Sequence, residues 1–375
     1  MRTTASFELF PDAPSERAMV RARWLAREGR ISEAESAYRE ALTTYPDLKP
    51  AWAEYFELLR SQKRAADALR LAFGARAQFG EAAFALALEG AALIELDRFR
   101  EALEVLEHAV DADPDLAVVW HELGFAAYRL GDRNRALLAL DRAFALEPHA
   151  ATLRLRGKVL RDAGRYQAAE VAFEAAAQSA EHDEQWDEAS DEIAATRRYA
   201  LYAPRKPADL GPAERWFADT GSVLLASGHS ATPPTDAELV TALVELASDS
   251  RWRFGQIVGF GDGPAELWAP LAQGLDAPLV SGGGLDVAAV PLVVAPQPLT
   301  GDLAWDACVA AIASRNSGCV FVLEQAGTGP ARADVIGALT DGGIRRPGAP
   351  NPGHALTEAQ HPAARLATRR LSLPG

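Results

Sequence analysis

A small residue recurs along the first half of this chain at a nearly constant interval. Successive alanines stand 34, 34, 34 and 33 residues apart, at Ala34, Ala68, Ala102, Ala136 and Ala169. A helix breaker follows the first four of them after twelve residues, as Pro46, Gly80, Pro114 and Pro148. A fixed period of this length is the signature of a repeat architecture, which constrains the fold more than any single motif does.

The residue types within each period predict a pair of helices. The segments between the breakers are rich in Ala, Leu, Glu and Arg, which favour helix. The recurring alanine lets two helix axes approach closely, and a bulky residue one turn later, such as Leu106 or Leu140, fills the groove beside it. Because one such hairpin cannot bury its apolar face alone, the hairpins must stack on one another.

These units resemble the tetratricopeptide repeat (TPR) family. The best-matching unit covers residues 83–116, and its residues at the family's positions are Gly90, Phe99, Ala102, Ala109 and Pro114. The other units are at 15–48, 49–82, 117–150 and 150–183, and residues 185–201 have the polar face of a capping helix. The resemblance implies an all-α helical-hairpin solenoid of about five units plus a capping helix over residues 15–202.

The resemblance also implies a binding surface, because the first helices of TPR hairpins line a concave groove. In this chain the groove positions combine an apolar, aromatic centre with basic ends, at Phe84, Ile94, His121, Phe125, Tyr128, Arg129, Arg154 and Lys158. Such a surface suits a peptide that carries apolar anchors flanked by carboxylates. The alternative, in which the arginines are only solvated helix faces, stays open. His121 has no neighbouring Cys or carboxylate motif, so we interpret it as a contact residue.

The residue composition changes near residues 203–210, where Gly, Pro and Val become more frequent, and we place a domain boundary there. Beyond it, amphipathic stretches alternate with short apolar runs at 255–260, 277–280, 290–295 and 318–324. The first amphipathic stretch begins at Thr235 with a helix-capping signature. Buried strands joined by helices predict a smaller α/β domain with a mostly parallel sheet over residues 208–330. The Pro/Gly/Arg-rich residues 331–375 are predicted to form a loosely ordered tail.

Two segments of this second domain, 259–280 and 291–312, are similar to type I phosphoribosyltransferases. That family holds the ribose hydroxyls with two adjacent acidic residues and the phosphate with the loop that follows. By this resemblance Thr300 and Gly301 are a candidate phosphate loop, but Ala295 and Pro296 stand where the acidic pair belongs. Without those carboxylates the sugar loses its main polar anchors, so we predict no catalytic residue and no phosphoribosyl transfer.

The net charge and the cysteine content exclude some classes of partner and some cellular compartments. A formal net charge of −14 would repel nucleic acid and anionic membranes. The two cysteines, Cys308 and Cys319, are too few for a disulfide scaffold and fit a reducing cytoplasm, with core packing as their predicted role. All but four of the 38 basic residues are arginine, which is typical of a GC-rich genome and favours a bacterial source.

The sequence therefore predicts a cytoplasmic, non-enzymatic adaptor that binds a protein or peptide and uses no metal or cofactor. The alternative is an enzyme or sensor whose second domain binds a phosphorylated small molecule or nucleotide. Self-association of the chain stays open.

Overall fold

The computed structural model describes residues 14–226, 230–261, 265–315, 318–327 and 333–348. Internal contacts group the chain into an N-terminal unit, Met1–Val159, and a C-terminal unit, Leu160–Gly375. The division falls within one helix, α9 (Ala150–Asp162). The domain boundary expected near residues 203–210 stays a prediction.

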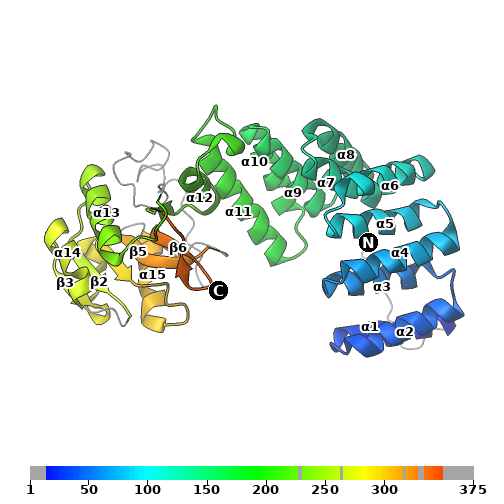
Figure 1. Cartoon of the computed structure of the whole chain (residues 1–375), viewed down its shortest axis with the longest axis horizontal. Coiled ribbons are helices and arrows are strands. Elements are labelled where there is room, and N and C mark those ends of the chain that lie inside the picture. Colours follow the sequence, from blue (N-terminus) through cyan, green and yellow to red (C-terminus); the bar gives the residue numbers. More distant parts are fainter. Residues whose placement is uncertain (1–13, 227–229, 262–264, 316–317, 328–332, 349–375) are drawn as a thin grey trace, which may run out of the picture. The chain divides into compact units, whose positions relative to one another are not determined.

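The N-terminal unit is a stack of helical hairpins (Figure 1). Its helices follow one another with the predicted period, and they precede α9 in this order: α1 (Pro14–Arg27), α2 (Ile31–Thr44), α3 (Lys49–Ser61), α4 (Ala65–Phe79), α5 (Ala83–Glu95), α6 (Phe99–Ala112), α7 (Ala117–Arg129) and α8 (Arg133–Leu146). The helical-hairpin solenoid predicted from the alanine spacing is therefore confirmed.

The interior of the array follows from its small residues. Ala102 and Ala136 are completely buried, as are the bulky residues one turn later, Leu106 and Leu140. A Cβ atom added to Gly90 would lie only 2.5 Å from Leu106, and one added to Gly124 would lie 2.8 Å from Leu140. Each leucine thus fills a space that a glycine on the preceding helix leaves open. The sequence predicted that these leucines fill the gap between helices, but not that a glycine lies opposite each of them.

The tight turns within the hairpins share one backbone conformation. The turn residues recur at the repeat spacing and have positive φ angles of 71°, 56°, 56°, 84° and 77°, at Gly29, Lys63, Asp97, Gly131 and Gly164. Glycine adopts this left-handed conformation without steric cost, whereas a side chain such as that of Lys63 does so at some cost in energy. The repeat geometry therefore imposes the turn even where the sequence does not offer a glycine.

The C-terminal unit begins with helices that share an apolar core with its sheet. After α9 come α10 (Tyr166–Gln178), α11 (Asp183–Ala200), a short 3₁₀ turn at Pro207–Asp209 and α12 (Pro212–Thr220). Tyr166, Tyr199 and Phe217 belong to the same buried cluster as the sheet residues. The Tyr199 hydroxyl donates to Asp219 Oδ1 at 2.5 Å, and the buried Arg198 donates to the Ala218 carbonyl. The helix predicted at residues 185–201 is therefore present as α11, and these bonds tie it to α12.

The sheet of the C-terminal unit has the order β1-β6-β5-β4-β2-β3, with β7 paired to β6. Its strands are β1 (Val223–Leu224), β2 (Gln256–Gly259), β3 (Leu279–Ser281), β4 (Pro291–Ala295), β5 (Cys319–Ala326), β6 (Val335–Asp341) and β7 (Ile344–Arg345). Every pairing is parallel except that of β6 with β7. The predicted mostly parallel sheet is confirmed.

Helices cover both faces of this sheet. One face, with residues such as Leu292 and Phe321, packs with α13 (Asp236–Asp249) and α14 (Ala265–Leu275). The other, with Val293 and Val320, packs with α15 (Leu303–Arg315). Since adjacent residues of a strand point to opposite faces, both must be apolar, which explains the continuous apolar runs in the sequence.

Part of the segment predicted as a loosely ordered tail is instead strand. Residues 335–345 form β6 and β7, so the prediction of a tail starting at 331 is wrong there. Gly337 on β6 permits the close approach of this strand to β5, because a Cβ at that position would lie 2.5 Å from the Leu323 carbonyl oxygen. Arg345 fixes the end of the segment through ion pairs with Glu324 at 3.0 Å and Asp236 at 2.5 Å. Residues 349–375 lie outside the described residues.

Candidate peptide-binding surfaces

The predicted groove residues all lie on first helices of the hairpins. Helix α5 carries Phe84 and Ile94, helix α7 carries His121, Phe125, Tyr128 and Arg129, and helix α9 carries Arg154 and Lys158. The side chain of Ile94 is only 8% exposed, so it offers little surface to a ligand. Arg129, at the end of α7, is exposed, and the other predicted groove residues are half-buried.

Two of the predicted anchors are held by contacts within the array. Phe84 packs edge-on against Phe79 with ring centres 5.7 Å apart, and Lys49 Nζ lies 5.8 Å from the Phe84 ring. Phe125 packs edge-on against Phe99 at 6.4 Å. These aromatic side chains are thus fixed in orientation, which lowers the entropy that a ligand contact would cost.

Arg129 is placed over the same aromatic pair. Its guanidinium lies 4.3 Å from the centre of the Phe99 ring and 5.7 Å from that of Phe125, and its Nη2 atom donates to Asp97 Oδ1 at 3.2 Å. The structure therefore brings two of the predicted groove residues, Phe125 and Arg129, together. An incoming carboxylate would have to compete with Asp97 for this guanidinium.

Carboxylates lie among the arginines of the first helices, and the prediction of a groove with basic ends did not take their charge into account. Arg60 on α3 forms ion pairs with Glu57 at 3.1 Å and with Glu95 at 2.8 Å. Burial raises the pKa of Glu122 on α7, and its neighbours Glu57 and Glu95 raise it further against the opposing effect of Arg60. At this point of the surface three carboxylates face one guanidinium. The spacing of 35 residues between Arg60 and Glu95, close to one repeat, was the available signal.

His121 lines a small hollow between α7 and α9. Its Nδ1 atom lies 3.0 Å from Thr152 Oγ1, and the hollow of about 220 Å³ is also lined by Val118 and His149. Burial, with a smaller effect from His149, lowers the pKa of His121 to about 4, so the ring is neutral at pH 7. A neutral imidazole bonded to a hydroxyl can act as a contact group, which is the role expected for it from the sequence.

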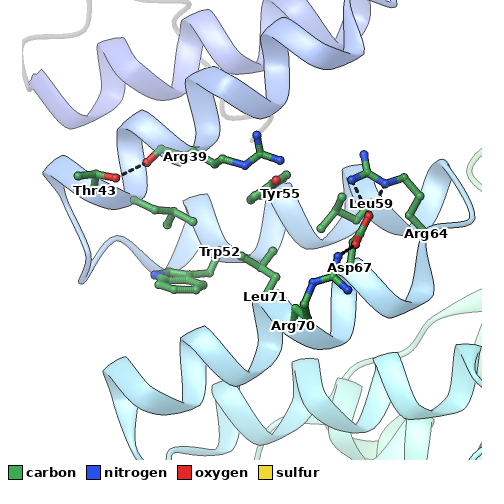
Figure 2. A pocket seen from close by; sticks show the side chains of 10 residues that line it. Arg39, Thr43, Trp52, Tyr55, Leu59, Arg64, Asp67, Arg70 and Leu71 are labelled. Carbon is green, nitrogen blue, oxygen red and sulfur yellow. Dashed lines mark hydrogen bonds and ion pairs between the residues drawn. The ribbon is translucent and has the colours of Figure 1, made fainter.

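A larger hollow lies on the second-helix side of the array, and Figure 2 shows it at close range. We name it the Arg39 hollow; its volume is about 560 Å³. Its floor comes from α3, with Trp52, Tyr55 and Leu59, and arginines from α2 and α4 stand on its rim. The complete lining is Arg39, Leu42, Thr43, Trp52, Tyr55, Leu59, Arg64, Asp67, Arg70 and Leu71.

The same hollow recurs two repeats later, with a volume of about 760 Å³. We name it the Glu107 hollow; its lining is Glu107, His108, Val110, Asp111, Trp120, Leu123, Arg135, Leu138, Ala139 and Arg142. Eight of these residues stand 68 positions after a lining residue of the Arg39 hollow. Trp52 Nε1 donates to the Pro46 carbonyl at 2.9 Å, and Trp120 Nε1 donates to that of Pro114 at 2.8 Å. The sequence signal for both hollows was this pair of tryptophans, which the groove prediction did not use.

The candidate phosphate loop follows β4, at the carboxyl edge of the sheet. In the sheet β3 lies on one side of β2 and β4 lies on the other, so the direction in which the chain adds strands changes at β2 and β4. Open parallel sheets bind ligands at such a point. However, the Gly301 N–H donates to Asp306 Oδ2 at 3.3 Å, and Asp302 Oδ1 accepts from the N–H groups of Ala304 at 2.9 Å and Trp305 at 3.0 Å. A phosphate at Thr300 and Gly301 would therefore lie near the carboxylates of Asp302 and Asp306, which repel it and already accept the hydrogen bonds of nearby N–H groups.

Two further observations concern the described residues alone. They include no group of three or more His, Cys, Asp or Glu side chains placed to hold a metal ion. None of the helices in these ranges has the length and apolar character needed to span a membrane. Cys308 and Cys319 are both 3% exposed, and burial raises the pKa of the Cys308 thiol to about 11.

The array is a TPR-like solenoid, and tetratricopeptide repeats mediate protein–protein interactions. A family model described as tetratricopeptide repeat matches residues 85–116. Protein FlbA of Caulobacter vibrioides is 33% identical over 129 residues, which cover 33% of this chain and 21% of FlbA. The match thus spans about a fifth of the length of that relative.

Several solved structures are also similar. A thermophilic TPR protein of Thermus thermophilus is 19% identical, with 48% of this chain and 98% of that chain covered and a TM-score of 0.43. YrrB, described as a TPR protein with an unusual peptide-binding site, is 17% identical, with 45% of this chain and 87% of that chain covered and a TM-score of 0.34.

Proposed function

We propose that this chain is a cytoplasmic adaptor whose hairpin array binds a peptide segment of another protein along its first helices. The observation that carries the proposal is the half-buried ring of Phe125, held in place by Phe99 and Arg129 on a fold built for protein binding. An apolar side chain of the partner packs against Phe125, Tyr128 and Phe84. Its acidic flanks lie toward the basic residues Arg129, Arg154 and Lys158.

The apolar anchor supplies most of the affinity in this arrangement. A truncated aromatic hot spot typically costs about 2 kcal/mol or more of binding free energy. An exposed charge pair contributes only about 0.2–1 kcal/mol and weakens as salt screens it. The contribution of Arg129 is reduced, because a flanking carboxylate must replace Asp97 beside its guanidinium.

The test is to identify the partner by co-purification and mass spectrometry, then to measure the affinity of its binding segment for variants of the full chain. Phe125→Ala should weaken binding at every ionic strength, whereas Arg154→Ala should weaken it only at low salt. Phe73→Ala serves as the control, because Phe73 is a 50% exposed aromatic residue on the second helix α4. If Phe125→Ala and Arg154→Ala both bind the segment as the wild type does at low salt, the first helices are not the site.

We further propose that the C-terminal unit does not transfer phosphoribosyl groups. Two observations support this: Ala295 is a fully buried apolar residue at the end of β4, where the family has an acid, and Asp302 and Asp306 already accept from the N–H groups near Thr300. Both carboxylates would repel the negative charge of a phosphate bound at this loop.

A further inference from the structure

The Arg39 hollow carries more positive than negative charge. Three guanidinium groups, from Arg39, Arg64 and Arg70, share two carboxylates, those of Glu35 and Asp67. This surplus lies in a chain with a net charge of −14, and it contrasts with the first helices, where Arg60 faces three carboxylates. A cationic patch of this kind is complementary to an anionic ligand.

The rim arginines keep hydrogen-bond donors for such a ligand. Arg39 gives one N–H to Glu35 Oε2 at 2.7 Å, and Arg70 gives one N–H to Asp67, although a guanidinium has five donors. Their side chains are 59% and 73% exposed. Figure 2 shows Arg39 and Arg70 on opposite sides of the hollow, with Trp52, Tyr55 and Leu71 between them. Arg39 also lies over the Tyr55 ring at 5.7 Å, which helps to fix its position.

The Glu107 hollow provides an internal comparison, because it is built from equivalent positions and has a different charge pattern. The positions of Arg39 and Arg70 are taken there by Glu107 and Leu138, and the position of Asp67 is taken by Arg135. Glu107 and Arg135 form an ion pair with each other. The repeat therefore reproduces the hollow but places different charges on its rim.

We propose that the Arg39 hollow is a second docking surface, which binds an acidic peptide segment of a partner protein. An apolar side chain of the segment packs on Trp52, Tyr55 and Leu71, and carboxylates on either side of it bond to Arg39 and Arg70. Planar guanidinium groups suit this task because they bind carboxylates with two parallel N–H donors. The adaptor then contacts proteins through both sides of its array.

The experiment uses the full chain and a defined probe, the peptide acetyl-Asp-Asp-Leu-Phe-Leu-Asp-Asp-amide, with a counterpart in which lysine replaces aspartate. The titrations are done in the Phe125→Ala background, which removes the main anchor of the proposed first-helix site. Calorimetry should then show that the acidic peptide binds one site and that the lysine peptide does not bind. The double variant Arg39→Glu with Arg70→Glu should bind at least about fivefold more weakly at low salt, with a smaller difference at high salt. Both positions are exposed, so the variant should fold.

The matched control is Leu138→Glu, which adds an acid at the position of the Glu107 hollow equivalent to Arg70. It should leave the affinity unchanged. The transplant variant Glu107→Arg, Arg135→Asp and Leu138→Arg should add a second site for the acidic peptide, which the stoichiometry reports.

Three results would overturn the proposal: no binding of the acidic peptide, equal binding of both peptides, or unchanged affinity in the Arg39/Arg70 double variant. A stoichiometry that stays at one in the transplant variant would refute the role of the rim charges. If Phe125→Ala abolishes binding and the double substitution in the wild-type chain does not, the peptide binds along the first helices. The docking surface proposed here then fails while the proposed function stands.

Discussion

The contact between Gly90 and Leu106 allows a sharp test of how the hairpins are packed. In Gly90→Ala the new Cβ atom would lie 2.5 Å from both Cγ and Cδ2 of Leu106, whereas ordinary contacts are 3.4–4 Å. Leu106 is completely buried and cannot move into solvent, so the two helices must separate. Overpacking of this kind costs up to about 3 kcal/mol, and the better helix propensity of alanine returns about 1 kcal/mol. We expect a net loss of about 2 kcal/mol in the free energy of unfolding.

Urea denaturation of the full chain, followed by far-ultraviolet circular dichroism, measures this loss. Gly74→Ala is the control, because its Cβ would meet Trp52 at 3.1 Å and the small strain should be balanced by helix propensity. Adding Leu106→Ala to Gly90→Ala removes the clash, so the double variant should lose at least about 1 kcal/mol less than the sum of the single losses. A Gly90→Ala protein as stable as the wild type, with additive losses in the double variant, would refute this account of the packing.

Three further predictions concern other parts of the chain. Replacing Ala102 or Ala136 with leucine should lower the free energy of unfolding by on the order of 1–3 kcal/mol, because both sites are fully buried, and unchanged denaturation midpoints would contradict the repeat register. The chain should release no pyrophosphate from phosphoribosyl diphosphate with any nucleobase, and release that Thr300→Ala abolishes would show the opposite. Because the pKa of His121 falls from 6.5 to about 4 on folding, the unfolded state binds a proton that the folded state does not, and stability should decrease as pH falls from about 6.5 to 4. Thermal melts of His121→Asn over that range should show a smaller decrease, and an equal one would assign the effect to other groups.

The repeat could be read from the sequence because its determinants are local and periodic. Ala102 and Leu106 lie one turn apart on one helix, and proline and glycine mark each helix end, so the pattern shows the packing directly. The parallel sheet could also be predicted from the sequence. Helices cover both of its faces, so Leu292 and Val294 on one face and Val293 on the other are all apolar.

The candidate binding surfaces were harder to predict because they depend on side chains from three helices at once. The Arg39 hollow exists where α2, α3 and α4 leave a gap above Trp52, and neither the gap nor the sharing of Asp67 by two arginines is visible in spacing alone. At the candidate phosphate loop the sequence shows Thr300 and Gly301 side by side. Only the structure shows that Asp306 already accepts from the Gly301 N–H.

The apolar cluster that joins α10–α12 to the sheet bears on how this chain can be divided for expression. A fragment that starts at residue 208, where the sequence texture changes, would lack Tyr166, Tyr199 and Tyr202, which belong to one cluster with Phe217 and Leu243 in the intact unit. The uncovered surface would be apolar and contiguous, and surfaces of this kind promote aggregation in water. A fragment that also retains α10 and α11 keeps this cover. Soluble expression of the sheet region should therefore require the helices α10 and α11, which the sequence assigns to the repeat array.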